Sequence, residues 1–139
     1  MLLADTSAWI WSRRRDYPDL RASFDEHVEA GEIWICEQVR LELLAGEHSS
    51  QVVQRRRDLD ALESVPITRN EWQRALEVQS GLAQLGTDLH KGIRPADLLI
   101  AAIAERSGLE LLHYDVHFER IQRVTKQPMR WLAAKGTLR

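Results

Sequence analysis

The fold is decided by the stretch of residues 95–104, PADLLIAAIA, because it predicts a helix that is apolar on nearly every side. Pro95 suits the first turn of such a helix, and Gly108 is placed to end it. Leu109–His113 follows as a short apolar run with the length of a buried strand. A helix without a polar face belongs in a protein core, so we expect this segment to be buried.

Outward from this segment, short apolar runs alternate with amphipathic stretches. Besides Leu109–His113, strands are predicted at Leu2–Ala4, Ile33–Cys36 and Met129–Leu132, with an extended piece around Pro66. Further helices are predicted from Thr6 or Ser7 (the expected caps) to Arg15, and over Leu20–Ala30, Gln38–Gly46, Ser50–Glu63, Asn70–Leu85 and a short stretch ending near Val124. Strands separated by helices need crossover connections. The sequence therefore predicts an α/β protein, a three-layer α/β/α sandwich with a mostly parallel central sheet.

The composition is that of one globular domain spanning residues 1–139, with 44% hydrophobic and 29% charged residues. Cys36 has no partner for an intrachain disulfide, which favours a reducing compartment. No apolar run approaches the roughly 20 residues that cross a bilayer, and we expect no signal peptide, no membrane association and a cytoplasmic location. The balance of 19 basic against 21 acidic residues argues against an indiscriminate polybasic nucleic-acid binder, but it does not exclude nucleic acid as a substrate.

Four acidic residues stand where the apolar pattern carries them inward. Asp5 follows the first predicted strand and Asp115 follows Leu109–His113, and the carboxyl ends of parallel strands line the ligand crevice of such sheets. Asp97 lies in the first turn of the apolar helix, and Glu42 shares a helix face with apolar neighbours. We therefore expect the four carboxylates to converge.

Converging carboxylates repel one another, so a cation is expected among them. Oxygen ligands without a cysteine cluster or paired histidines favour Mg²⁺, with Mn²⁺ as a substitute, over zinc. These ions serve phosphate chemistry. Each acid also has an ordinary explanation: Asp5 as a helix cap, Asp97 as a partner of the helix dipole, Asp115 in an Asx turn, and Glu42 on an exposed helix face.

Basic residues near these acids are candidate phosphate contacts. Lys91 and Arg94 precede Asp97 in a polar loop, and we expect both at the rim of the acidic pocket. The runs Arg13–Arg15 and Arg55–Arg57 either extend a surface for a nucleic-acid backbone or are simply solvated helix faces. Five tryptophans are open to a similar choice between core packing and interfaces: Trp9, Trp11, Trp34, Trp72 and Trp131.

Four segments together resemble the acidic motifs of PIN-domain ribonucleases: LLADTSA at residues 2–8, RLELLAG at 40–46, PADLLIAA at 95–102 and LHYDVHF at 112–118. Their order and the chain length most resemble VapC toxins of type II toxin–antitoxin pairs. The resemblance implies a PIN-like fold. It also implies that the four acids bind the metal and carry catalysis, with Thr6 and Ser7 lining the site. His117 departs from the pattern, because relatives often carry a further acid there; it leaves open whether one or two ions bind.

The resemblance further implies an Mg²⁺- or Mn²⁺-dependent endoribonuclease in which a metal-activated water attacks RNA, with transfer RNA or ribosomal RNA as targets. It implies a homodimer neutralised by a VapB-type antitoxin. Three alternatives remain at this point: a non-catalytic PIN-like module that binds RNA or a partner, a metal-dependent nuclease acting on DNA, and a phosphatase of the haloacid dehalogenase type. The last of these expects an acid where Ser7 stands.

Overall fold

Five parallel strands form the centre of the protein in the computed structural model, which describes residues 1–139. The strands run in the order β3-β2-β1-β4-β5, and every neighbouring pair is parallel. Their bounds are β1 Leu2–Ala4, β2 Ile33–Cys36, β3 Glu63–Val65, β4 Glu110–His113 and β5 Met129–Trp131. The prediction of a mostly parallel sheet is confirmed, and the sheet is in fact entirely parallel.

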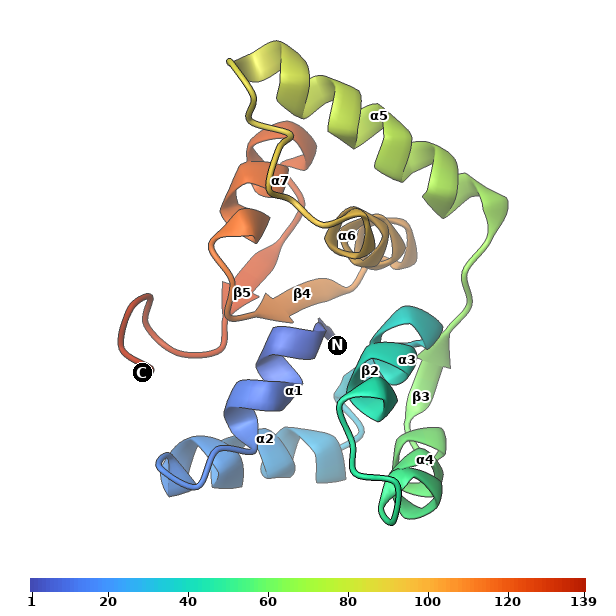
Figure 1. Ribbon diagram of the computed structural model, residues 1–139, viewed down its shortest axis with the longest axis vertical. Helices are drawn as coiled ribbons and strands as arrows, with labels where there is room; N and C mark the ends of the chain where they lie inside the picture. The colour runs from blue at the N-terminus through green and yellow to red at the C-terminus, as the bar shows by residue number, and fades with distance from the viewer.

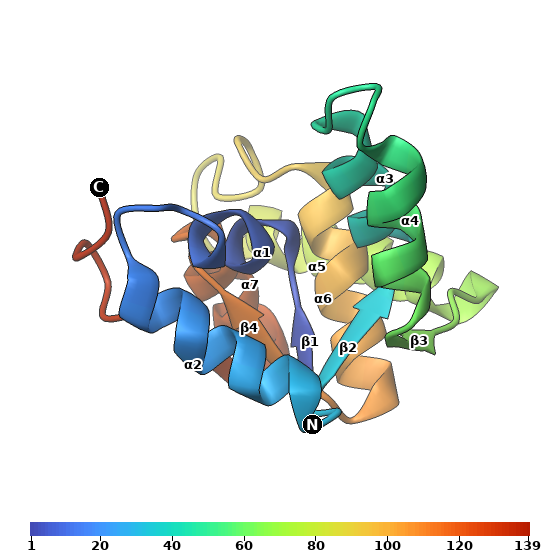
Figure 2. The same ribbon diagram turned by 90° about the horizontal axis from the view of Figure 1, so that it is seen from below.

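Seven helices surround the sheet, and their bounds are α1 Thr6–Ser12, α2 Pro18–Glu29, α3 Glu37–Ala45, α4 Val52–Asp60, α5 Arg69–Leu85, α6 Pro95–Ser107 and α7 His117–Thr125. Figure 1 shows α5, α6 and α7 on one side of β4, with α1 and α2 on the other side. The helices α3 and α4 lie beyond α1, next to β2 and β3, as Figure 2 shows. This arrangement confirms the three-layer α/β/α sandwich.

The apolar helix α6 is buried as the sequence predicted. Every residue from Asp97 to Ala104 is buried, and the helix packs against α5, α7 and β4. Gly108 ends α6 in the left-handed conformation, with φ of 70°, which glycine adopts without steric cost. The core therefore forms around α6 and the three central strands, in a single cluster of 28 buried residues.

The cap of α1 and the start of α2 differ from the prediction. Asp5, and not Thr6 or Ser7, caps α1, because its side chain accepts a hydrogen bond from the backbone N–H of Ala8. That helix also ends at Ser12, before the predicted Arg15. The helix α2 begins at Pro18, two residues before the predicted Leu20, since proline lacks an N–H and fits a first helical turn.

The strand order places a topological switch point between β1 and β4. The chain proceeds from β1 to β2 and β3 on one side, and then crosses to β4 and β5 on the other. Asp5 follows β1 directly and Asp115 follows β4 after one residue, so both lie at the carboxyl edge of these two neighbouring strands. In open α/β sheets, ligands bind at such a point.

Candidate active site

Asp5 is buried and is held by hydrogen bonds from its own neighbours. It is 2% exposed, and its Oδ1 accepts from the Ala8 N–H at 2.9 Å. The Ser7 hydroxyl lies 2.7 Å from Oδ1 and 2.9 Å from Oδ2. Burial raises the pKa of Asp5 from its ordinary value of 3.8 to about 7, against the lowering effect of these hydrogen bonds. A nearby cation would favour the charged form of this carboxylate.

Asp97 lies in the first turn of α6 and is 1% exposed. Burial raises its pKa, and the negative charges of Asp115 and Glu42 raise it further. The guanidinium of Arg94 opposes this effect, because its Nη2 donates to Oδ1 of Asp97 at 2.9 Å. Asp97 therefore brings a carboxylate from α6 close enough to Asp115 and Glu42 for their charges to raise its pKa.

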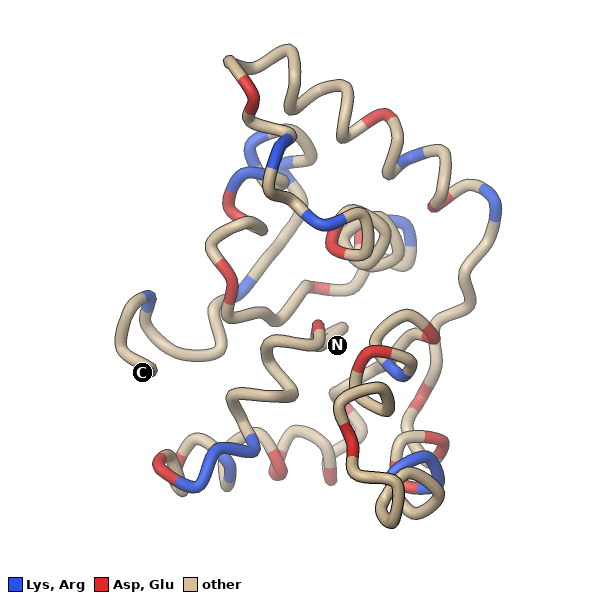
Figure 3. Tube along the Cα trace, viewed as in Figure 1, with Lys and Arg blue, Asp and Glu red and all other residues tan.

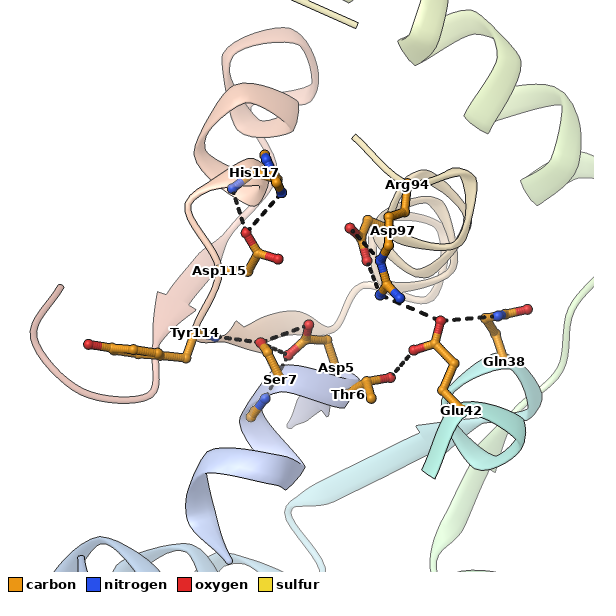
Figure 4. Close-up of polar contacts among 11 residues, drawn as sticks. Asp5, Thr6, Ser7, Gln38, Glu42, Arg94, Asp97, Tyr114, Asp115 and His117 are labelled. Carbon is orange, nitrogen blue, oxygen red and sulfur yellow. Dashed lines mark hydrogen bonds and ion pairs between the residues drawn. The ribbon is translucent and has the colours of Figure 1, made fainter. Parts of the chain in front are cut away.

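Glu42 reaches the same cluster from α3. Its Oε1 lies 3.5 Å from Nη2 of Arg94 and accepts from Gln38 at 3.3 Å. Its other carboxylate oxygen accepts a hydrogen bond from the Thr6 hydroxyl. Arg94 therefore bridges α3 and α6, and Figure 4 shows its guanidinium between the carboxylates of Glu42 and Asp97.

Asp115 completes the cluster from the segment after β4. Its Oδ1 accepts from the His117 backbone N–H at 2.9 Å and lies 3.1 Å from the ring Nδ1 of His117. The buried ring of His113 accepts from the Asp115 backbone N–H at 3.3 Å. Burial lowers the pKa of His113 to about 4, so this ring is neutral and its Nδ1 is able to accept.

Two hydroxyls join the start of α1 to the acids. The Ser7 hydroxyl contacts Asp5 and also accepts from the Tyr114 backbone N–H at 2.8 Å, which ties α1 to the segment after β4. Thr6 donates to Glu42 and so ties α1 to α3. Both residues therefore line the cluster, and their hydrogen bonds hold the carboxylates of Asp5 and Glu42 in place (Figure 4).

Lys91 does not join the acids through any contact. Its ammonium lies 3.3 Å from Asp88, within its own loop, and its carbonyl accepts from Arg120. Of the two basic residues expected at the rim, only Arg94 touches the cluster. The sequence reasoning also missed Gln38 and His113. Gln38 stands one helical turn before Glu42, which is a readable signal, whereas the role of His113 depends on the turn after β4.

The donor set fits a hard divalent cation. Asp97, Asp115 and His117 each offer one ligand atom, and these atoms all lie within 4.8 Å of one another. Asp5 and Glu42 add two more carboxylates nearby, and the only cation among them is the half-exposed Arg94. Oxygen-rich sites of this kind suit Mg²⁺ or Mn²⁺, and a single imidazole is compatible with Mn²⁺.

A family model described as PIN domain matches residues 2–124. Among curated proteins, Ribonuclease VapC18 of Mycobacterium tuberculosis is 37% identical over 135 residues, which cover 96% of each chain. Ribonuclease VapC51 of the same organism is 34% identical, covering 98% of this chain and 96% of its own.

Solved structures agree in fold. A VapBC-1 structure from nontypeable Haemophilus influenzae aligns with a TM-score of 0.72 at 18% identity, covering 94% of this chain and 97% of that one. A DNA-bound VapBC from Salmonella typhimurium aligns with a TM-score of 0.69, also at 18% identity, covering 95% and 98%. The expected PIN-like fold is thus confirmed. Together with the two full-length relatives, the match shows that this chain belongs to the PIN-domain family and, within it, to the VapC ribonucleases.

Proposed function

We propose that this ribonuclease is the toxin of a type II toxin–antitoxin pair and cleaves RNA with Mg²⁺, or Mn²⁺ in its place, held by its acidic cluster. The observation that carries the proposal is the convergence of Asp5, Glu42, Asp97 and Asp115 from four separate parts of the chain on one partly buried site. Such a concentration of negative charge is costly without a cation. A module that only binds a partner gains nothing from this electrostatic repulsion between carboxylates.

Each residue takes a role that follows from its position. Asp97 and Asp115 hold the cation directly, and the charges of Asp5 and Glu42 complete the site. A bound Mg²⁺ neutralises charge on phosphoryl oxygens and lowers the pKa of a bound water. Ser7 orients Asp5. Thr6 orients Glu42.

Two further side chains face the same cluster. Arg94 is exposed enough to turn from the acids toward a phosphate of the RNA. His117 lies beside Asp115 where a further acid would favour a second ion, so we propose one tightly held ion. His117 then serves as a contact to phosphate or to Mn²⁺.

Incubation of the purified chain with transfer RNA and ribosomal RNA tests the activity. Cleavage is expected with Mg²⁺ and Mn²⁺, to be lost in excess EDTA, and to leave 5′-phosphate and 3′-hydroxyl ends. A DNA strand of the same sequence is the control for the nuclease alternative. If only DNA is cleaved, the protein is a deoxyribonuclease. If no nucleic acid is cleaved, the alternative of a non-catalytic module is favoured.

We propose a VapB-type antitoxin as the protein partner. The structural relatives with this fold were solved as VapBC assemblies, which supports the proposal without locating the interface. Expression of the chain alone is expected to arrest growth, and co-expression of a small neighbouring reading frame is expected to restore it. Harmless expression of the wild-type chain counts against the toxin assignment.

We also propose a homodimer formed through α5. Trp72 is 55% exposed and Leu76 is 64% exposed, and the two lie one helical turn apart on this helix. Large apolar side chains grouped on a surface mark interaction sites. Trp9, in contrast, is buried in the core.

None of the helices combines the length and apolar composition that crossing a bilayer requires, and a cytoplasmic location stays a prediction.

A further inference from the structure

A cavity of about 530 Å³ adjoins the acidic cluster. Residues of α1 to α4 and their connecting segments line it, and Figure 2 shows α1 and α2 on one side with α3 and α4 on the other. Glu42 belongs both to the cavity wall and to the acidic cluster, so the two are neighbours. A second cavity of about 300 Å³ shares Trp9, Arg13, Arg21 and Arg55 with the first.

Basic side chains from both sides enter this space, and Figure 3 shows basic residues gathered at the end of α1 and along α4. The guanidinium carbons of Arg13 and Arg55 each lie 5.7 Å from the ring centre of Trp9. Asp25 neutralises Arg13 at 2.6 Å and lies 4.0 Å from Arg21. Arg55 makes no ion pair, although the negative charges of Glu47 and Asp58 lie near enough to raise its pKa.

Arg55 is therefore held at an electrostatic cost. Burial lowers the pKa of Arg55, and the positive charge of Arg13 lowers it further. A half-buried guanidinium without a counter-ion is unfavourable, and departures of this kind are expected at functional sites.

Unused hydrogen-bond donors surround the same space. Trp9 Nε1, Arg13 Nε and Arg55 Nε are buried and have no hydrogen-bond partner. A buried donor without a partner costs free energy. All three donors belong to residues that line both cavities, so these unpaired donors are grouped at one place in the fold.

We propose that this arginine pocket, formed by Trp9, Arg13, Arg21 and Arg55, binds a backbone phosphate of the RNA next to the bond that is cut. The inference rests on the proposed ribonuclease function. Guanidinium groups match phosphate oxygens in geometry and charge. A carboxylate is satisfied by one guanidinium fork, whereas donors from α1, α2 and α4 around one cavity suit a tetrahedral anion. An RNA strand whose scissile phosphate rests at the acids passes this pocket at Glu42.

RNA binding without cleavage tests the pocket. Fluorescence anisotropy of a labelled single-stranded oligoribonucleotide, measured in EDTA, compares wild type with Arg13→Gln/Arg55→Gln. The double variant is expected to bind roughly tenfold more weakly, since each charge-assisted hydrogen bond contributes at this level. The slope of log K against log salt is expected to become shallower by about 0.7 for each phosphate that the variant no longer neutralises.

A control variant removes the same charge elsewhere. Arg69→Gln/Arg123→Gln changes two exposed arginines that form no ion pair and line neither cavity, and its affinity is expected to change less than about twofold. EDTA separates this experiment from catalysis. Wild type that binds through the pocket but never cleaves with Mg²⁺ contradicts the proposed function alone, and cleavage with an unchanged affinity in the double variant contradicts the pocket alone.

An NMR signal from the pocket itself shows whether the RNA binds there. The indole N–H resonance of Trp9, assigned with Trp9→Phe, is expected to shift on addition of the RNA to wild type and to stay fixed in the double variant. If the double variant does not fold, Arg55→Gln alone, which removes only an unpaired charge, replaces it. Unchanged RNA affinity in a folded variant overturns the proposal. So does an acidic peptide that shifts Trp9 when RNA does not, because the pocket then serves a protein partner.

Discussion

Nη2 of Arg94 lies 2.9 Å from Oδ1 of Asp97 and 3.5 Å from Oε1 of Glu42, so one guanidinium occupies the space between two acids of the proposed metal site. The Arg94 side chain is 57% exposed and is free to leave when a stronger cation arrives. We therefore expect Arg94 to compete with a bound metal ion for these carboxylates, and a displaced guanidinium would be available to the phosphate backbone.

Arg94→Ala is expected to have opposite effects on metal and RNA. Affinity for Mn²⁺, measured by calorimetry without RNA, should rise by up to about fivefold, because a partly exposed ion pair is worth about 1 kcal/mol at most. RNA cleavage at saturating Mg²⁺ should fall. Lys91→Ala is the matched control from the same loop, since Lys91 pairs with Asp88 and should alter neither quantity. Weaker Mn²⁺ binding by Arg94→Ala contradicts the competition.

The pH dependence of stability is expected to follow Asp5. Its pKa is about 7 in the folded protein and near 3.8 when unfolded, so between these values the folded state holds a proton that the unfolded state has lost. The metal-free protein therefore loses stability as pH rises through this window, on the order of a few kcal/mol.

Asp5→Asn tests this assignment, because asparagine also caps helices but carries no charge. In EDTA, urea unfolding between about pH 5 and pH 8 should show a flatter stability profile for the variant and higher stability than wild type at the upper end. Mg²⁺ should stabilise wild type more than the variant. Parallel profiles for the two proteins are incompatible with the raised pKa of Asp5.

Ser7→Ala is expected to loosen the site. The Ser7 hydroxyl joins the Asp5 carboxylate to the Tyr114 backbone N–H, and its loss leaves a donor on Tyr114 without its partner. We expect a loss of about 1–2 kcal/mol in the free energy of unfolding, together with slower cleavage. Ser7→Thr keeps the hydroxyl and should retain more of both properties. Equal losses in the two variants exclude the hydroxyl as the cause.

Trp72→Glu is expected to separate the proposed dimer. A charge beside the exposed Leu76 on α5 opposes association, while the exposed position of Trp72 leaves the core intact. Light scattering after size-exclusion chromatography should report a dimer for wild type and a monomer for the variant. The exposed Val53 on α4 offers a control, as Val53→Glu should leave the mass unchanged. A monomeric wild type contradicts the proposal.

The sequence predicted the meeting of the acids because parallel strands align their carboxyl ends. Once Leu2–Ala4 and Leu109–His113 were recognised as strands of one sheet, Asp5 and Asp115 had to lie at one edge. The apolar character of α6 placed Asp97 in the interior, as the structure confirms. These inferences needed only periodicity and strand direction.

Where several similar residues could make the same contact, the sequence did not predict which of them makes it. Residues 5–7 offer three possible helix caps in succession, and only the backbone geometry selects Asp5. Arg94 and Lys91 look alike in the sequence, yet loop geometry turns one to Asp97 and the other to Asp88. The approach of Arg13 to Arg55 arises from the packing of α1 near α4, which no local pattern encodes.

The central claim, that the acidic cluster performs metal-dependent RNA cleavage, is tested most directly with Asp97→Asn. This change keeps the shape of the side chain and removes one carboxylate, so the variant should retain its fold by circular dichroism. The measurement is the initial rate of RNA cleavage in Mg²⁺, beside Asp88→Asn as a control acid outside the cluster. We predict that Asp97→Asn abolishes cleavage and that Asp88→Asn cleaves like wild type. Undiminished cleavage by folded Asp97→Asn, or by wild type in excess EDTA, would contradict the claim.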